Sequence, residues 1–271
     1  MHLTLGGSYN SQKTHYFKTI DDLLGGDFWV DLDQFAARDS DDPNAAQNNL
    51  NTPNDVVRVG DTFGYDYDIH TNMGNVFGQL EKKWHKVDAY LGLTASQTTF
   101  WHHGHYDKAL FPETSFGESP KQNFTSGGAK AGAVYKLNGR NYITANAAYL
   151  SNAPTARNAY LSPRTRDAII SDLTTEKDLS GDISYEVRMP RVQGRATLYY
   201  ANTSDGIWSR SFYHDVYQTF VNYSMTGVGE LHEGAEIAAQ VKLSPTWEAT
   251  AVVADGQYVY NSRPTATVTR D

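Results

Sequence analysis

Residues 234–260 read GAEIAAQVKLSPTWEATAVVADGQYVY, and this stretch decides the fold class. In its first half every second residue is apolar, namely Ala235, Ile237, Ala239, Val241 and Leu243. The positions between them include Glu236, Gln240 and Lys242. A short Ser244-Pro245-Thr246 segment then leads into a second alternating run that starts at Trp247. A period of two predicts β-strands, and a short turn between two such runs predicts an antiparallel hairpin.

The same pattern recurs along most of the chain and predicts about nine strands. Very short turns are expected around His85, Gly139, Pro190 and Pro245, and they alternate with long polar segments. Outer-membrane barrels sort their connections in this way, with short turns at the periplasmic end and long loops outside. The sequence therefore predicts an all-β, antiparallel up-and-down meander that forms a segment of a transmembrane β-barrel.

The composition of the two strand faces bears on what the apolar face touches. It is rich in Ala and Gly and carries aromatic residues near the turns (Trp84, Tyr135 and Trp247), whereas the other face carries Glu, Lys, Arg and Gln. A soluble core favours bulkier, interdigitating side chains, and Trp and Tyr are typical of the membrane interface. The alternative is a soluble β-sandwich or lectin-like binding module.

Two short helices are expected within the long loops. Thr19 with Asp22, before Leu23-Leu24 and Gly25-Gly26, resembles a helix with a capping box and a glycine stop. Asp31 with Gln34, before Phe35-Ala36-Ala37, predicts a second helix. Long polar loops are further expected over residues 11–62, 106–124, 151–175 and 208–217.

Composition excludes several classes of function. The 271-residue chain has a formal net charge of −8, which argues against nucleic acid as a partner. It has no cysteine, so disulfides, thiolate metal sites and cysteine nucleophiles are ruled out. No serine-hydrolase elbow, P-loop or zinc-protease helix motif is present. We therefore expect neither an enzyme nor a bound cofactor.

Several short motifs, in their order along the chain, resemble the TonB-dependent outer-membrane receptors, especially those of the Bacteroidetes type. They are AYLSPRTRD (159–167) followed by Glu176-Lys177, SFYHD (211–215), TFVNY (219–223), Gly234-Ala235-Glu236 and SRPTAT (262–267). The resemblance covers most of the chain and is densest after residue 153.

The resemblance implies a parent barrel of about 22 strands with a plugged lumen. Residues 1–271 would then be one partial barrel, with the plug domain and the remaining strands absent. The implied function is TonB-coupled import of a scarce ligand (a metal chelate such as a siderophore complex, cobalamin or a glycan) across the cell outer membrane. The implied partners are outer-membrane lipid, the transported ligand and the TonB complex, which would act through the absent plug.

Aromatic and histidine residues at the strand ends are candidates for ligand contact, because in this family such extracellular residues touch the imported molecule and aromatic rings stack on a sugar or catechol. Ordinary loop packing is the competing interpretation. The candidates are Tyr65, Tyr67, Trp101, His103, His105, Trp208, Phe212, Tyr213 and His214.

The run Trp101-His102-His103-Gly104-His105 also raises the question of a metal site. Adjacent strand residues point to opposite faces, so only His103 and His105 can converge. A solvated loop or outer girdle is the favoured interpretation, and no metal site is predicted. The acidic stretch from Asp31 to Asp42 lacks the glycine and terminal glutamate of a calcium-binding loop.

Overall fold

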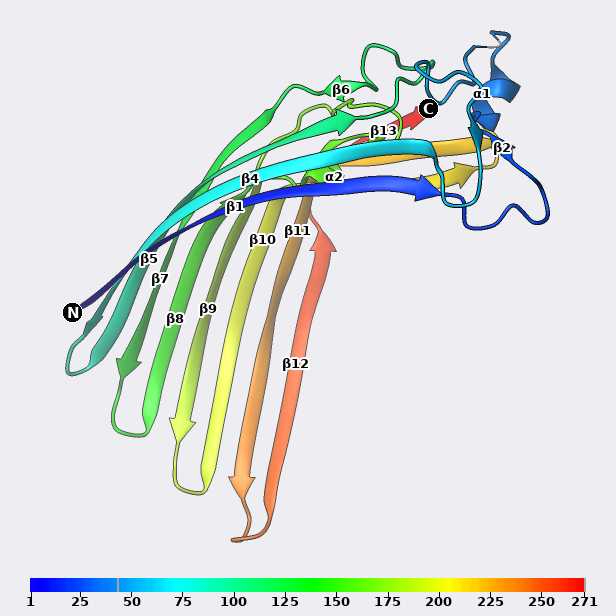
Figure 1. Ribbon diagram of the computed structural model, residues 1–271. Helices are drawn as coiled ribbons and strands as arrows, with labels where there is room; N and C mark the ends of the chain where they lie inside the picture. The colour runs from blue at the N-terminus through cyan, green and yellow to red at the C-terminus, as the bar shows by residue number, and fades with distance from the viewer. Residues whose placement is uncertain (43, 271) are drawn as a thin grey trace.

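A computed structural model describes residues 1–42 and 44–270, and one large antiparallel sheet dominates it (Figure 1). Nine strands follow one another across this sheet in the order β1-β4-β5-β7-β8-β9-β10-β11-β12. Their bounds are β1 His2–Thr19, β4 Thr62–Lys83, β5 Val87–Gly104, β7 Gln122–Lys136, β8 Asn141–Asn152, β9 Glu176–Arg188, β10 Val192–His214, β11 Thr219–Lys242 and β12 Glu248–Tyr260.

The remaining elements are short and lie at one end of the sheet (Figure 1). Strand β6 (Gly117–Glu118) pairs with β5, and β13 (Thr265–Arg270) pairs with β11. Strands β2 (Trp29–Val30) and β3 (Val56–Val57) form a separate two-stranded sheet. The helices are α1 (Gln34–Asp39) and α2 (Ala156–Ala159), and within the described ranges no helix is long and apolar enough to cross a membrane.

Most connections between neighbouring strands are sorted by length between the two ends of the sheet. Tight turns at residues 84–86, 137–140, 189–191 and 243–247 lie together at one end, while segments 20–61, 105–121 and 153–175 lie at the other (Figure 1). The exception is the connection 215–218 between β10 and β11, which is short although it lies at the long-loop end. The curved meander and this sorting confirm the predicted fold class, a segment of a transmembrane barrel with long loops that carry short helices. A sandwich would need a second sheet facing the first, and the described residues supply only the two-residue strands β2 and β3.

The register assigns each strand residue to a face. Ile69 on β4 and Phe100 on β5 pack against the Tyr160 core, which marks the inner face. Because alternate residues share a face, the inner face of β4 continues through Gln79 and Glu81, whereas Val76 and Leu80 lie on the outer face. The apolar residues of the outer face are exposed, for example Ile237 at 60% and Ile183 at 50%.

The accessible surface of the chain is unusually large, at 16824 Å². A soluble monomer of this mass exposes about 11,700 Å². In the part of the chain that the structure describes, the buried apolar side chains lie in the long segments or in the strand halves next to them, with Phe100, Tyr160 and Val221 among the largest. The half of the sheet near the tight turns therefore has no protein core, and both of its faces are open.

Several sequence-based boundaries are wrong at the long-loop end. Strand β1 continues to Thr19, and residues 208–217 form the paired ends of β10 and β11 instead of a loop. The first expected helix, which would begin at Thr19 and end at Gly25-Gly26, does not form. The second expected helix forms as α1, but its N-cap is Asp33, whose carboxylate accepts hydrogen bonds from the amides of Phe35 and Ala36, and not Asp31.

A pair of arginine substitutions tests the assignment of faces. Ile237→Arg places a charge near the middle of the outer apolar face of β11 and should lower the free energy of unfolding by about 2–4 kcal/mol in a bilayer. Gln240→Arg, on the inner face of the same strand, should change it far less because that side is wet and Glu248 is nearby. Urea titration of the protein in lipid vesicles measures both, and equal losses would contradict the assignment.

Candidate ligand-binding site

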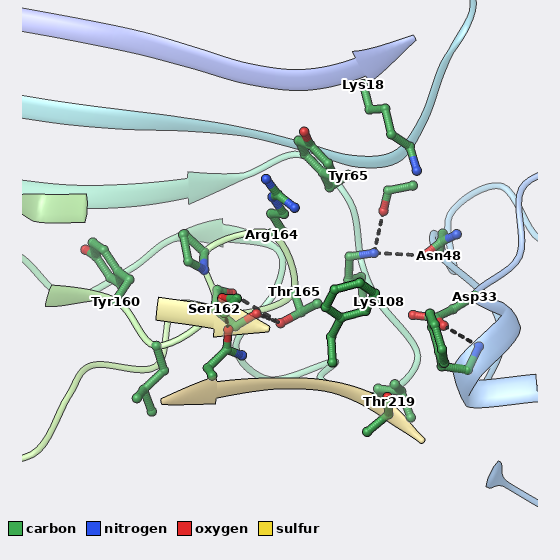
Figure 2. Close-up of a pocket in the computed structure, with 18 of the residues that line it drawn as sticks. Lys18, Asp33, Asn48, Tyr65, Lys108, Tyr160, Ser162, Arg164, Thr165 and Thr219 are labelled. Atoms are coloured by element: carbon green, nitrogen blue, oxygen red, sulfur yellow. Dashed lines mark hydrogen bonds between the residues drawn. The ribbon is translucent and has the colours of Figure 1, made fainter. Parts of the chain in front are cut away.

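A cleft of about 1150 Å³ opens on the inner side of the sheet at its long-loop end (Figure 2). Its walls come from the ends of β1 and β4, the segment around α1, residues 157–165 and the β10–β11 pair. Side chains from segments far apart in sequence therefore meet there. The residues that line the cleft include Lys18, Asp31, Asp33, Asn48, Tyr65, Lys108, Arg157, Arg164, Trp208 and Arg210.

A buried polar network around Lys108 supports one wall of the cleft. The Lys108 ammonium donates to Asn48 Oδ1 at 2.8 Å and to the Gly64 carbonyl at 2.5 Å (Figure 2). The Asp31 carboxylate accepts from the Gly64 amide and from the Asn48 side chain. Gly64 has φ of +75°, and a Cβ there would lie 3.0 Å from the Lys18 side chain. Glycine is therefore the residue that fits this turn.

Burial changes the ionisation of this lysine. Lys108 is 7% exposed, and its desolvation lowers its pKa to about 8, although Asp33 and Asp31 oppose the shift. Burying a charge is costly unless it is well hydrogen-bonded, and here two oxygens accept from the ammonium. Lys108 is thus a buried hydrogen-bond donor that links segment 44–64 to segment 105–116.

Helix α1 is fixed to the β10–β11 pair and closes the cleft on that side. Phe35 meets Phe220 edge to face with ring centroids 6.0 Å apart, and Arg38 donates to the Gln218 carbonyl at 2.7 Å. Hydrogen bonds from Arg38, and then from Arg270, lower the pKa of Asp39 to about 2. The carboxylates near α1 are therefore occupied by capping and ion pairing.

Three arginines give the cleft its charge. Arg164 lies over the Tyr65 ring at 5.1 Å and Arg210 over the Trp208 ring at 5.3 Å. Neither they nor Arg157 belong to any ion pair found among the described residues. In contrast, Asp31 is used by the Gly64 turn and Asp33 by the α1 cap. The available charge in the cleft is therefore positive, and aromatic rings lie beside it.

The segment that carries Arg157 and Arg164 is attached to the inner face of the sheet. Tyr160 is 1% exposed and packs with Phe100 and Ala159, and its hydroxyl lies 3.1 Å from that of Ser119. The His102 ring hydrogen-bonds the Pro163 carbonyl at 2.8 Å. These contacts hold residues 156–165 as part of the cleft floor.

The structure separates the nine predicted ligand-contacting residues. Tyr65 and Trp208 line the cleft. Tyr67 lies beneath it, stacked between Tyr16 and His102 with centroids 5.0 Å from each.

The other six predicted residues do not line the cleft. Trp101 and His103 lie on the outer face, because they alternate with the inward-facing Phe100 and His102. His105 follows β5 and hydrogen-bonds Asp68 on the same outer face. Phe212, Tyr213 and His214 lie at the end of the β10–β11 pair, where the first two are exposed.

Sequence reasoning missed the cationic residues of the cleft. Lys18, Lys108 and Arg210 come from separate segments, and no local pattern relates them. For Arg164 in the Ser-Pro-Arg-Thr-Arg run, the sequence favours a salt-bridge cluster with Arg166 and Asp167 over an anion site, whereas the structure places Arg164 in the lining of the cleft.

Comparison with known proteins gives a likeness of fold. No protein-family model matches the chain, and no curated protein matches its sequence. Among solved structures, the copper transporter OprC, an outer-membrane β-barrel, matches 95% of this chain with a TM-score of 0.65 at 12% sequence identity. The match covers 35% of the OprC chain, so the present chain spans about a third of that length.

The depressed pKa of Lys108 predicts a pH-dependent stability. Between about pH 8 and the ordinary lysine value of 10.5, the unfolded chain holds a proton that the folded chain has lost, so stability should rise with pH across this window. Across this window the free energy of unfolding should rise by about 3 kcal/mol more in the unmodified protein than in Lys108→Met, which cannot titrate at this position. Urea unfolding of both proteins in detergent at several pH values measures the difference, and parallel curves would contradict the prediction.

Proposed function

We propose that this chain forms part of the wall and the extracellular rim of an outer-membrane transporter that imports a scarce ligand by TonB-coupled active transport. The barrel fold, the sorting of connections and the likeness to an outer-membrane transporter support this proposal. So do the motifs that resemble TonB-dependent receptors. In this proposal TonB acts on a plug domain outside these residues, and the outer apolar face contacts lipid.

The chemistry of the cleft favours binding over catalysis. Its lining contains no histidine and no cysteine, and Lys108, the buried lysine, is committed to two hydrogen bonds. Its volume suits a ligand at or above the upper end of drug size. A non-enzymatic binding vestibule at the extracellular mouth is the function that this lining supports best.

The three arginines of the cleft indicate an anionic ligand, and they are the main evidence for this proposal. Arg157, Arg164 and Arg210 line a cleft whose carboxylates are already engaged, and Tyr65 and Trp208 lie beside two of them. Guanidinium groups bind anionic oxygens, and aromatic rings stack on planar groups. Among metal chelates, cobalamin and glycans, an anionic metal chelate with aromatic ligand groups matches both features. A neutral sugar would use the rings and leave the arginines without a role.

Charge removal in the cleft tests the ligand class. The double variant Arg157→Ala/Arg164→Ala should weaken binding of a ferric tris-catecholate at least about tenfold, since each lost hydrogen bond to a charged group is worth about 1.5–3 kcal/mol. Arg140→Ala is the matched control, because Arg140 lies in the tight turn between β7 and β8 at the opposite end. Tryptophan fluorescence of the detergent-solubilised full-length protein measures the affinities.

Two results would contradict this ligand class. One is an unchanged affinity for the ferric catecholate in the double variant. The other is tighter binding of a neutral oligosaccharide than of the anionic chelate, together with insensitivity to the arginine substitutions.

Energy coupling is tested separately in cells. Uptake of the radiolabelled ferric chelate through this protein should fall to background in a strain that lacks TonB, while surface binding persists, because binding at the rim needs no energy. Uptake that continues without TonB would contradict active transport and leave passive diffusion as the mechanism.

A further inference from the structure

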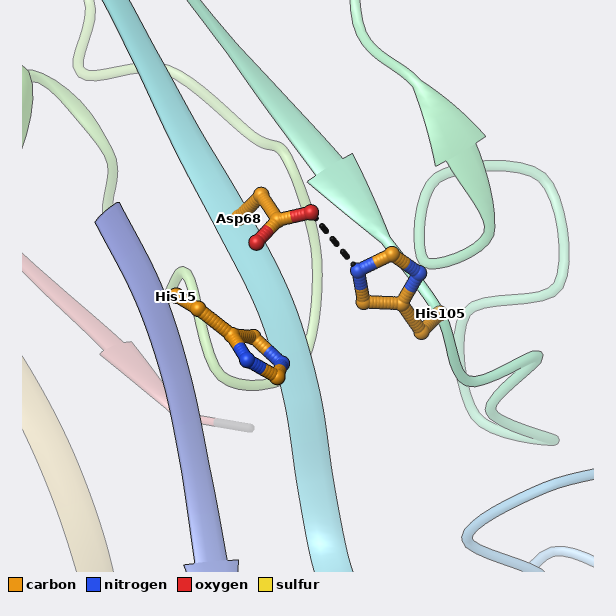
Figure 3. A group of neighbouring side chains, drawn as sticks. All are labelled: His15, Asp68 and His105. Atoms are coloured by element: carbon orange, nitrogen blue, oxygen red, sulfur yellow. Dashed lines mark hydrogen bonds and ion pairs between the residues drawn. The ribbon is translucent and has the colours of Figure 1, made fainter. Parts of the chain in front are cut away.

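A second cluster of polar side chains lies on the outer face of the sheet, on the side opposite to the cleft. Four histidines surround the carboxylate of Asp68: His15 from β1, His70 from β4, His103 from the end of β5 and His105 just beyond that strand (Figure 3 shows Asp68 with two of them, His15 and His105). The carboxylate is 1% exposed on its side chain. A buried carboxylate among imidazoles is the donor set of zinc and copper(II) sites in proteins.

Two overlapping sets of three residues have ligand atoms within 4.8 Å of one another. The sets differ in whether these atoms already form hydrogen bonds or ion pairs with other protein groups. In the first set, His15, Asp68 and His105, the His15 Nε2 is 2.5 Å from Asp66 Oδ1, and the His105 Nε2 is 2.8 Å from Asp68 Oδ2. Lys13 also contacts Asp68 Oδ2 at 2.8 Å. The atoms of this set are therefore satisfied by protein partners.

The second set, Asp68, His70 and His103, has atoms left over. Asp68 Oδ1 and His70 Nε2 are both buried, and neither has a hydrogen-bond partner. Buried polar atoms are nearly always paired, so two orphans in one cluster call for a ligand between them. A metal cation accepts electron pairs from both a carboxylate oxygen and an imidazole nitrogen, so a bound metal would satisfy both atoms.

Neighbouring groups hold these ligands in place. The His70 ring stacks on Trp101 with centroids 4.7 Å apart and an interplanar angle of 4°. Lys13 and His105 fix the carboxylate through Oδ2, so Oδ1 is presented to His70 and His103. Such contacts behind the ligands orient them and tune their affinity.

We propose that Asp68, His70 and His103 bind a divalent transition metal of the Zn²⁺ or Cu²⁺ type at the outer rim of the barrel. Three protein ligands leave a fourth position for water or for an external donor. The metal would join β4 to β5 on the outer face.

The place of this site separates it from the import pathway. His70 is six residues beyond Val76, the last large apolar residue on the outer face of β4, or about 20 Å along the strand. The inner face at this level carries Tyr67 and His102 instead. The metal would therefore bind outside the barrel and above the apolar band, and the proposal does not depend on the transported ligand.

Metal titration of tag-free full-length protein in detergent tests the site. Zn²⁺ affinity, measured by competition with a chromophoric chelator, should fall about tenfold or more in His70→Gln and in His103→Gln. Co²⁺ should produce visible absorption bands of a four-coordinate site in the unmodified protein and lose them in both variants. His85→Gln, in the tight turn at the other end of the same strand pair, is the matched control and should keep the original affinity.

The variant His15→Gln decides between the two sets. Retained Zn²⁺ affinity in this variant supports the assigned ligands, because His15 belongs only to the set whose atoms are already paired. A loss in His15→Gln with unchanged affinity in His70→Gln would overturn the assignment. Equal Zn²⁺ affinity in all four variants, or no saturable binding by the unmodified protein, would overturn the site itself. Two substituted histidines on different strands keep the test valid if one variant fails to fold.

Discussion

The rest of this structure depends on the requirement that every backbone amide and carbonyl in a hydrocarbon layer be paired by a neighbouring strand. The β4–β5 pairing runs from Lys83 to Tyr67 without a shift in register. The irregularities that do occur, after Phe17 in β1 and between Thr203 and Trp208 in β10, lie toward the long-loop end. There water and loops can satisfy the groups that a bulge leaves unpaired. The tight-turn half keeps regular ladders because it has no such alternative.

The same requirement determines where the protein can pack. Near the tight turns each residue faces either the outer apolar side or the inner polar side, so among the described residues no buried apolar side chain is found there to form a core. Packing is displaced to the other end, where segments 20–61, 105–121 and 153–175 fold over the inner face. That core is partly polar: Lys108, Asn48 and Asp31 are as buried as Tyr67. The cleft exists because loops rather than a second sheet cover the inner face.

The sequence predicted the fold best where one face of the sheet meets lipid and the other meets water, because apolar and polar residues then alternate along each strand. The hairpin at residues 234–260 and the turns around His85, Gly139 and Pro190 follow from alternation alone. Above the apolar band both faces meet water, and the contrast between alternate positions disappears. For this reason the last part of β1 and residues 208–217 look like loops in sequence but are paired strands. The cap of α1 was displaced from Asp31 to Asp33 because Asp31 binds the Gly64 turn, a tertiary contact that no local pattern encodes.

The candidate site was less predictable, because alternation continues beyond the apolar band and sorts neighbouring residues to opposite sides. Tyr65 and Tyr67 face inward while Asp66 and Asp68 face outward, and His102 faces inward while His103 faces outward. Residues adjacent in sequence therefore serve two unrelated surfaces, and the aromatic and histidine runs that were grouped as one site are divided between them.

Conversely, Arg164 and Trp208, more than forty positions apart, meet in one cleft because the sheet curves and loops fold inward. A one-residue slip in register would exchange the two surfaces completely. The register of β4 against β1 and β5 is thus what keeps the arginine cleft on the inner face and the histidine cluster on the outer one.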